Sequence, residues 1–222
     1  MNIEKVTLSG HTIDLVPLSQ RHAEGLCEAS QHAEIWRYMP VPMPDLEGTR
    51  EIIRTALAEQ RRLVSLPFAI VEKSSGRVVG CTRYMSIWHP HRQLEIGYTW
   101  LAPEVWRTNI NTECKYLLLR HAFETLEAVR VQLKTDSRNF RSQTAILRLG
   151  ATREGILRKH MIRSDGFIRD TVMFSIIEAE WPAVKSRLEK LLERPERKCK
   201  ETPATERSTG ENPTEKIVVS DL

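Results

Sequence analysis

The sequence predicts an α/β (α+β) domain in which helices cover both faces of a mixed, mostly antiparallel sheet. Two observations lead to this prediction. Between residues 68 and 101, three strand-like apolar segments follow one another through short turns, as in an antiparallel meander. From about residue 111, helical segments separate the strands, so the chain must make crossover connections as well as hairpins.

The first half of the chain has clear start signals for its helices. Ser19 and Asp45 are suitable N-caps, because a short oxygen-bearing side chain can accept a hydrogen bond from the first helical turn. The prolines between them disfavour helix in the residues that precede them, which predicts an extended loop. The expected elements are a strand over 11–18, helices over 20–30 and 34–39, a loop over 40–45, a helix over 46–63 and strands over 68–72, 78–87 and 94–101.

The second half alternates helices and strands before a final hairpin. The expected elements are a helix over 111–126, a strand over 129–135, a helix over 139–149, strands over 152–162 and 168–177 and a helix from 181 to about 194. In the helix over 111–126, the residues Cys114, Leu118, Ala122 and Leu126 recur at helical spacing and predict its buried face.

Composition excludes several classes of protein. No apolar run approaches the length of a membrane span, and the N-terminus lacks the apolar core of a secretory signal. The net charge of +4 is too small, and the basic residues too scattered, for a dedicated nucleic-acid binder. The four cysteines show neither metal-ligand nor CxxC spacing, which predicts reduced thiols, a cytoplasmic protein and no metal.

The chain is expected to consist of one folded domain, 1–194, and a polar tail, 195–222. The tail contains no aromatic residue and is rich in Pro, Thr, Glu and Lys. Such a segment cannot bury enough apolar surface to offset its chain entropy, so we expect it to be disordered.

A strand that leads through a polar turn into a helix is the main chemical signal. In the segment 94–127, the turn WRTNIN joins the strand LEIGYTWL to the amphipathic helix. A helix N-terminus offers unpaired N–H groups and a partial positive charge, and Arg107 adds a guanidinium. The turn is therefore a candidate cradle for a phosphate or pyrophosphate, although an ordinary helix capped by Asn111 has the same pattern.

This turn and the order of elements resemble the GNAT superfamily of acetyl-CoA-dependent N-acyltransferases. The resemblance is greatest to the Rim-type branch, whose characterised members acetylate protein N-termini. The pyrophosphate motif of the family reads Q/R-x-x-G-x-G/A and is usually followed by T-E. Anchoring it on Thr112-Glu113 places Trp106 at the Q/R position, Asn109 at the first glycine and Asn111 at the Gly/Ala position. No glycine remains, and asparagine is the residue that best tolerates a left-handed backbone in its place.

Two further segments carry the resemblance. Asn139 and Ser142 in NFRSQTAILRLGA match the family's N-x-x-S/A…L-G-A/F helix beside the pantetheine arm, and EIGY (95–98) matches its splayed central strand, where a bulge frees backbone groups. The resemblance implies a cosubstrate, acetyl-CoA, and contacts with it from Trp100, Leu101, Arg107, Thr108, Asn109, Ile110, Asn111, Thr112, Asn139 and Ser142.

For the chemistry, Glu95 is the candidate general base, acting through a water molecule; a solvent-facing glutamate in a salt bridge is the alternative. His89 and His91 are further candidates for the base. Many GNAT enzymes use a tyrosine seven residues after the asparagine as general acid, but Ile146 stands there, which leaves Ser142 as the nearest candidate. The resemblance implies direct attack of the amine on the thioester.

Aromatic residues are candidates for the acceptor site. In GNAT-like folds, the loops that carry Trp36 and Tyr38 and that carry Trp88 face each other across the acceptor groove, although these rings could equally pack in the core. The expected acceptor is a primary amine, on a small molecule or a peptide N-terminus, and the protein a monomer or homodimer without nucleic-acid or membrane partners. The alternative function is an acyl-CoA-binding regulatory module that has lost catalysis.

Overall fold

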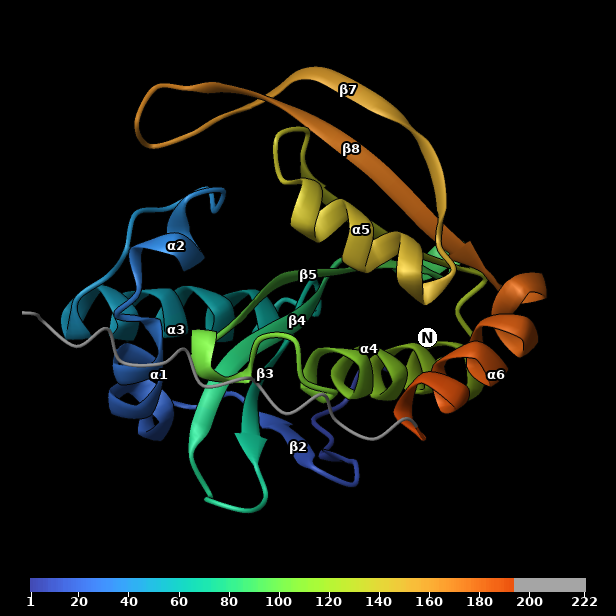
Figure 1. Cartoon of the computed structure of the whole chain (residues 1–222), viewed down its shortest axis with the longest axis horizontal. Coiled ribbons are helices and arrows are strands. Elements are labelled where there is room, and N and C mark those ends of the chain that lie inside the picture. Colours follow the sequence, from blue (N-terminus) through green and yellow to red (C-terminus); the bar gives the residue numbers. More distant parts are fainter. Residues whose placement is uncertain (194–222) are drawn as a thin grey trace, which may run out of the picture.

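A computed structural model describes residues 1–193 and shows one eight-stranded sheet flanked by helices (Figure 1). The spatial order of the strands is β1-β2-β3-β4-β5-β6-β8-β7, and β5–β6 is the parallel pair in an otherwise antiparallel sheet. The strands are β1 Leu8–Ser9, β2 Ile13–Pro17, β3 Leu66–Glu72, β4 Val78–Trp88, β5 Gln93–Leu101, β6 Arg130–Asp136, β7 Thr152–Ile162 and β8 Ile168–Ile177.

Helices lie on both faces of the sheet, as predicted. They are α1 Ala23–Ser30, α2 Ala33–Trp36, α3 Leu46–Arg61, α4 Ile110–Arg120, α5 Phe140–Leu149 and α6 Trp181–Leu192. One apolar cluster joins α1, α2 and α3 to inward residues of β3, β4 and β5. A larger cluster joins α4, α5 and α6 to the opposite face. We call these two sides the α1–α3 face and the α4 face.

Several predicted boundaries are reproduced, and the differences are local. Asp45 caps α3 by accepting a hydrogen bond from the Gly48 amide at 2.7 Å. The predicted helix over 111–126 begins one residue earlier, with Asn109 rather than Asn111 in the N-cap position, and its last part is a π turn over His121–Thr125. The predicted tail, 195–222, lies outside the described residues. Within residues 1–193, no helix is long and apolar enough to cross a membrane.

The centre of the sheet opens between β5 and β6. These strands pair through three residues of each, the last pair being Glu95 with Gln132. Beyond that point β5 continues to Leu101 and β6 to Asp136, but the two strands no longer pair with each other. The splayed central strand implied by the resemblance is therefore present, and one edge of β5 offers backbone groups without a strand partner.

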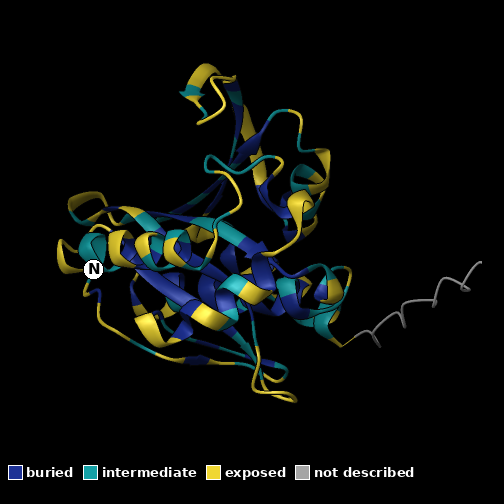
Figure 2. Cartoon of the chain, turned by 90° about the vertical axis from the view of Figure 1, so that its left-hand side faces the viewer, coloured by how far each residue is buried: buried dark blue, intermediate teal, exposed yellow. Residues whose placement is uncertain are grey.

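The last two strands form a long arm at the edge of the sheet. In Figure 1, β7 and β8 arch over α5 and their connecting turn points towards α2. A hydrogen bond from Arg163 Nη1 to the Arg37 carbonyl, 2.8 Å long, fixes this approach. Nearly all residues of β7 are exposed, and Figure 2 shows exposed residues gathered on the projecting arm while the central strands are buried. An open hollow lined by Ile156–His160 runs along the arm, and we refer to it, together with the region between the arm and α2, as the groove.

Candidate active site

The splayed strand β5 carries a bulge next to its open edge. Between Arg83–Gly97 and Cys81–Trp100, the pairing register of β4 and β5 shifts, and Tyr98 adopts a left-handed backbone with φ +48°. The bulge turns successive peptide groups away from the regular ladder. It lies in the part of β5 that β6 no longer covers, so unpaired backbone groups and an irregular strand occur at the same place.

The first turns of α4 lie beside the same bulge, since Lys115 Nζ of α4 donates to Thr99 Oγ1 of β5. The N-cap residue Asn109 makes no side-chain capping hydrogen bond, while the Ile110 amide donates to Thr108 Oγ1 at 3.3 Å. The next amides, those of Asn111 and Thr112, belong to the first turn of the helix, where N–H groups have no intrahelical acceptor. This end of α4 can therefore accept an anionic group through backbone N–H donors and the helix dipole.

The loop before α4 forms without glycine, but not in the way that the asparagines suggested. Arg107 has the left-handed backbone, with φ +66°, while Asn109 is in the ordinary helical region. A left-handed conformation costs an L-residue about 1–2 kcal/mol, so the loop holds strain at Arg107. Trp106 anchors the loop: its Nε1 donates to the Leu101 carbonyl at 2.8 Å, and its ring lies 3.9 Å from Arg141 Cζ of α5.

The start of α5 is built by the predicted pair of residues. The Asn139 side chain accepts a hydrogen bond from the Ser142 amide at 3.0 Å and thereby caps the helix. This leaves the Ser142 hydroxyl half-exposed on the first turn, whereas Ile146 is buried in the core. Helix capping thus explains the asparagine at position 139 but not the serine, whose backbone amide alone takes part, and the structure places no hydroxyl at position 146.

The side chains of three other predicted contact residues face the protein. Ile110 is part of the core, and Thr112 Oγ1 accepts a hydrogen bond from Arg148 Nη2 at 3.0 Å. Trp100 packs in the core with its ring 5.8 Å from that of Trp36. Ile110 and Thr112 can therefore offer a ligand only backbone groups.

Lys115, which the sequence reasoning did not single out, is a buried cation at this site. It is 7% exposed, and its Nζ donates to Thr99 Oγ1 of the bulge at 2.7 Å. Thr99 Oγ1 in turn lies 2.8 Å from Thr82 Oγ1. Within residues 1–193, Lys115 forms no ion pair with a carboxylate, and burial lowers its pKa. A lysine between the buried Cys114 and Leu117 was the signal available in the sequence.

Glu95 lies at the point where β5 and β6 separate. It is 1% exposed, which excludes the solvent-facing alternative. Its Oε2 accepts a hydrogen bond from Gln132 Nε2 at 3.0 Å and forms an ion pair with Lys134 Nζ, also at 3.0 Å, so the buried carboxylate has a counter-charge. A Cβ at position 97 would lie 2.8 Å from Glu95 Oε1; the glycine of EIGY thus leaves room for this oxygen.

The groove between the arm and α2 holds a second buried carboxylate. Asp136 accepts hydrogen bonds from Arg138 Nε at 3.0 Å and Nη2 at 2.8 Å. Burial favours its neutral form, but the hydrogen bonds and charge of Arg138 outweigh this effect and lower the pKa of Asp136. Arg138 Cζ lies 3.6 Å from the centre of the Phe167 ring and 5.8 Å from that of Tyr38.

Of the predicted acceptor-site aromatics, Tyr38 lies by this groove. Trp36 is 5% exposed and donates its indole N–H to the Ser30 carbonyl at 2.8 Å. The cavity beside Trp36 measures about 20 Å³, too little for an amine substrate. Trp88 is exposed and its ring packs against His91, 4.1 Å away between centres. The structure therefore does not bring Trp88 together with Trp36.

Two other groups have their chemistry limited by their surroundings. His89 Nδ1 lies 3.1 Å from the Met1 carbonyl and its Nε2 3.0 Å from the Leu63 carbonyl, so both ring nitrogens are engaged. Cys81 lies beside the bulge, with its Sγ 3.7 Å from the Tyr98 carbonyl. Burial raises the pKa of Cys81 to about 12, so its thiol stays protonated.

Comparisons with known proteins agree with this geometry. Residues 13–152 match the family model described as Acetyltransferase (GNAT) domain. A Bacillus subtilis protein named uncharacterized N-acetyltransferase YoaA is 25% identical over 162 residues, which cover 72% of this chain and 90% of that protein. A second Bacillus subtilis protein, provisionally named ribosomal N-acetyltransferase YdaF, is 31% identical over 50% of this chain and 59% of its own length.

A solved structure is similar over most of the described chain. The crystal structure of a GCN5-related N-acetyltransferase from Brucella melitensis has a TM-score of 0.80 and 29% sequence identity, and 86% of each chain is covered. The eight-stranded sheet with its splayed centre is therefore the architecture of known acetyltransferases.

Proposed function

The chain belongs to the GNAT acetyltransferase family, and from this premise we propose that it transfers an acetyl group from acetyl-CoA to a primary amine by direct attack on the thioester. The observation that carries the proposal is the position of Glu95, where the splayed strand β5 begins to separate from β6. In this proposal the open edge of β5 and the start of α4 bind acetyl-CoA, and the buried carboxylate of Glu95 acts on the amine.

The residues present fit the anionic and polar parts of acetyl-CoA. The first-turn amides of α4, Arg107 and the buried Lys115 supply positive charge for the pyrophosphate. The unpaired edge of β5 can exchange hydrogen bonds with the amide groups of the pantetheine arm. Arg141 of α5 lies over the ring of Trp106, so α5 contacts the loop that precedes α4. We call this loop, residues 106–109, the phosphate loop.

For the transfer step, Glu95 takes the proton of the amine through a water molecule, and the neutral amine attacks. An amine is largely protonated at neutral pH, so a base is required. The ion pair with Lys134 and the hydrogen bond from Gln132 both involve Oε2, which leaves Oε1 to accept the proton. A backbone N–H of the bulge stabilises the oxyanion that forms with the new C–N bond. The C–S bond then breaks, and the departing thiolate takes up the remaining proton of the nitrogen through solvent, without an acyl-enzyme. The raised pKa values of Cys81 and Cys114, about 12 and about 11, disfavour a cysteine nucleophile.

The identity of the acceptor amine is the open part of the proposal. The name of YdaF suggests a ribosomal protein as one class of acceptor, and small amines are the other. A screen of amines and peptides with acetyl-CoA, measuring release of free CoA and the mass of the product, tests the function. No acetylated product from any amine, together with tight acetyl-CoA binding, would instead support the regulatory-module alternative. We also propose a cytoplasmic location, which rests on the cysteine spacing of the sequence.

A further inference from the structure

One charged side chain in the groove beneath the arm lacks a partner. Arg169 of β8 is 5% exposed, and its buried Nε has no hydrogen-bond acceptor. Among the described residues, no ion pair includes Arg169. A guanidinium carries five N–H donors, and buried charged groups in proteins are normally paired. A buried arginine in this state requires an explanation.

The register of the strands places Arg169 on the same sheet face as Glu95. Thr171 and Arg169 are two residues apart in β8 and therefore share a face. Thr171 pairs with Asp136, which shares its face of β6 with Gln132, and Gln132 pairs with Glu95. Arg169 thus belongs to the α1–α3 face, where the amine must approach the candidate base.

The carboxylates near Arg169 are already paired with other cations. Asp136 and Glu95 both interact electrostatically with Arg169, but Asp136 is bonded to Arg138 and Glu95 to Lys134. Arg163, a further guanidinium nearby, is paired with Asp165, so three ion pairs and the guanidinium of Arg169 leave one positive charge here without an ion-pair partner within residues 1–193. Burial is the largest effect on Arg169 and lowers its pKa, and the nearby guanidiniums of Arg163 and Arg138 act in the same direction.

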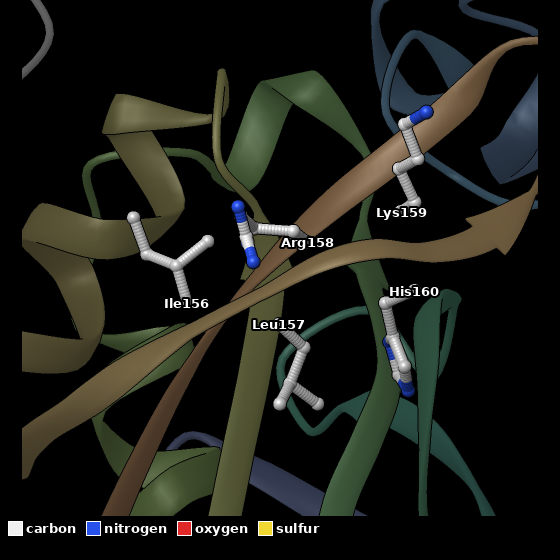
Figure 3. A pocket seen from close by; sticks show the side chains of 5 residues that line it. All are labelled: Ile156, Leu157, Arg158, Lys159 and His160. Carbon is white, nitrogen blue, oxygen red and sulfur yellow. The ribbon is translucent and has the colours of Figure 1, made fainter.

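Open space lies along β7, the strand that pairs with the strand of Arg169. An open hollow of about 670 Å³ runs along β7 and is lined by Ile156–His160. In Figure 3, Leu157 and His160 point to one side of β7, while Ile156 and Arg158 point to the other. His160 Nδ1 lies 3.1 Å from Thr171 Oγ1, so the side with Leu157 and His160 is the one that carries Arg169.

We propose that the acceptor is an amine that also carries a carboxylate, and that Arg169 binds this carboxylate. The inference rests on the proposed function, since it names the acceptor class of the same site. A carboxylate supplies the charge and the hydrogen-bond acceptors that the guanidinium lacks, in a geometry that allows two parallel bonds. A neutral amine or an amide would leave Arg169 buried and unpaired.

The test compares acceptors that differ only in this group. Free L-amino acids and their carboxamides are assayed with acetyl-CoA, and peptides that begin with Glu or Asp are compared with peptides that begin with Gln or Asn. We expect kcat/KM to be about 10–100-fold higher for the carboxylate member of each pair, as for a charged hydrogen bond. A preference among free amino acids identifies a small acceptor, and one among peptides identifies an acidic protein N-terminus.

Variants connect the preference to the residue. Arg169→Met is expected to remove the preference by raising KM for the carboxylate, so that the kcat/KM values of the carboxylate and the carboxamide become similar. Arg169→Lys keeps the positive charge but loses the two parallel N–H donors of the guanidinium, so it is expected to retain part of the preference for the carboxylate. Arg158→Gln is the matched control, because it removes one charge from the same arm at an exposed residue on the side of β7 opposite His160 and Leu157. Equal use of both members by the parent enzyme, or a preference that survives in Arg169→Met, overturns the inference.

Binding of the products gives a readout that needs no turnover. N-acetyl-L-amino acids and N-acetyl-L-amino acid amides are titrated into the parent protein and into Arg169→Met by calorimetry, in the presence of CoA. Tighter binding of the acids to the parent alone supports the inference, and equal binding contradicts it. If no amine of either class is acetylated, the proposed function fails, and this titration still decides the role of Arg169.

Discussion

Replacement of Lys115 by methionine is expected to stabilise the protein while weakening its affinity for acetyl-CoA. Lys115 is 7% exposed, and its ammonium donates a hydrogen bond to Thr99 Oγ1 at 2.7 Å and forms no ion pair within residues 1–193. Methionine keeps most of the apolar stem and removes the charge. The lost hydrogen bond costs about 1.5–3 kcal/mol, whereas relief of the desolvation penalty is worth several kcal/mol.

The two effects leave a net stabilisation of about 1–2 kcal/mol, or a rise in Tm of about 2–6 °C for a domain of this size. The affinity for acetyl-CoA should fall about 5–30-fold, since the pyrophosphate loses a buried positive charge. Differential scanning calorimetry and isothermal titration with acetyl-CoA measure the two quantities. Thr99→Val is the control, because it removes the hydrogen bond and keeps the charge, and it should lower Tm.

The pH dependence of stability checks the same reasoning. Because burial lowers the pKa of Lys115 in the folded protein, the unfolded chain binds the extra proton between that pKa and the ordinary value of 10.5. The free energy of unfolding of the parent should therefore rise with pH in this window, and the rise should be absent in Lys115→Met. A variant that is less stable than the parent and binds acetyl-CoA equally well would refute the reasoning.

Three further changes have expected outcomes. Arg107→Ala and Arg107→Gly should each weaken acetyl-CoA binding by about 1–2 kcal/mol in calorimetric titration. Arg107→Gly should be the more stable of the two variants, because glycine accepts φ +66° without strain, and equal Tm values of the two variants would exclude that strain. Arg138→Met should cost about 1–2 kcal/mol at pH 7, limited by solvent screening because Arg138 is 42% exposed. This loss should shrink as pH falls and the carboxylate of Asp136 protonates, and a pH-independent loss in denaturant titration would contradict it. Deletion of residues 195–222 should leave Tm and transferase activity nearly unchanged, and a large fall in Tm would show that the tail packs on the domain.

Features that local sequence determines were predicted well. The Asp45 cap of α3 depends on residues within one turn, and the bond from the Gly48 amide confirms it. The strands over 152–162 and 168–177 have the predicted boundaries, because the turn SDG separates two segments of strand-like composition. The start of α5 follows the same rule, since Asn139 caps the helix that it begins.

Features that depend on contacts between distant residues were not accessible in this way. The sequence alone left open whether Glu95 is buried. Its partner Lys134 lies 39 residues later and comes close only through the parallel pairing of β5 with β6. The unpaired state of Arg169 has the same origin, as it follows from the register of β6 and β8. The conformation of the phosphate loop was predicted only in part. A left-handed residue was expected there, but that residue is Arg107 rather than Asn109.

The pH profile of Glu95→Gln tests the central claim most directly. With saturating acetyl-CoA and an accepted amine, kcat/KM is measured for the parent and the variant from about pH 6 to pH 9. If Glu95 is the base of a direct transfer, the variant should be about 10²–10⁴-fold slower near pH 7. The deficit should shrink towards pH 9, where more of the amine is already neutral, while the affinity for acetyl-CoA stays unchanged. A variant as active as the parent across this range, or a catalytically competent acetyl-cysteine found by mass spectrometry, would contradict the account.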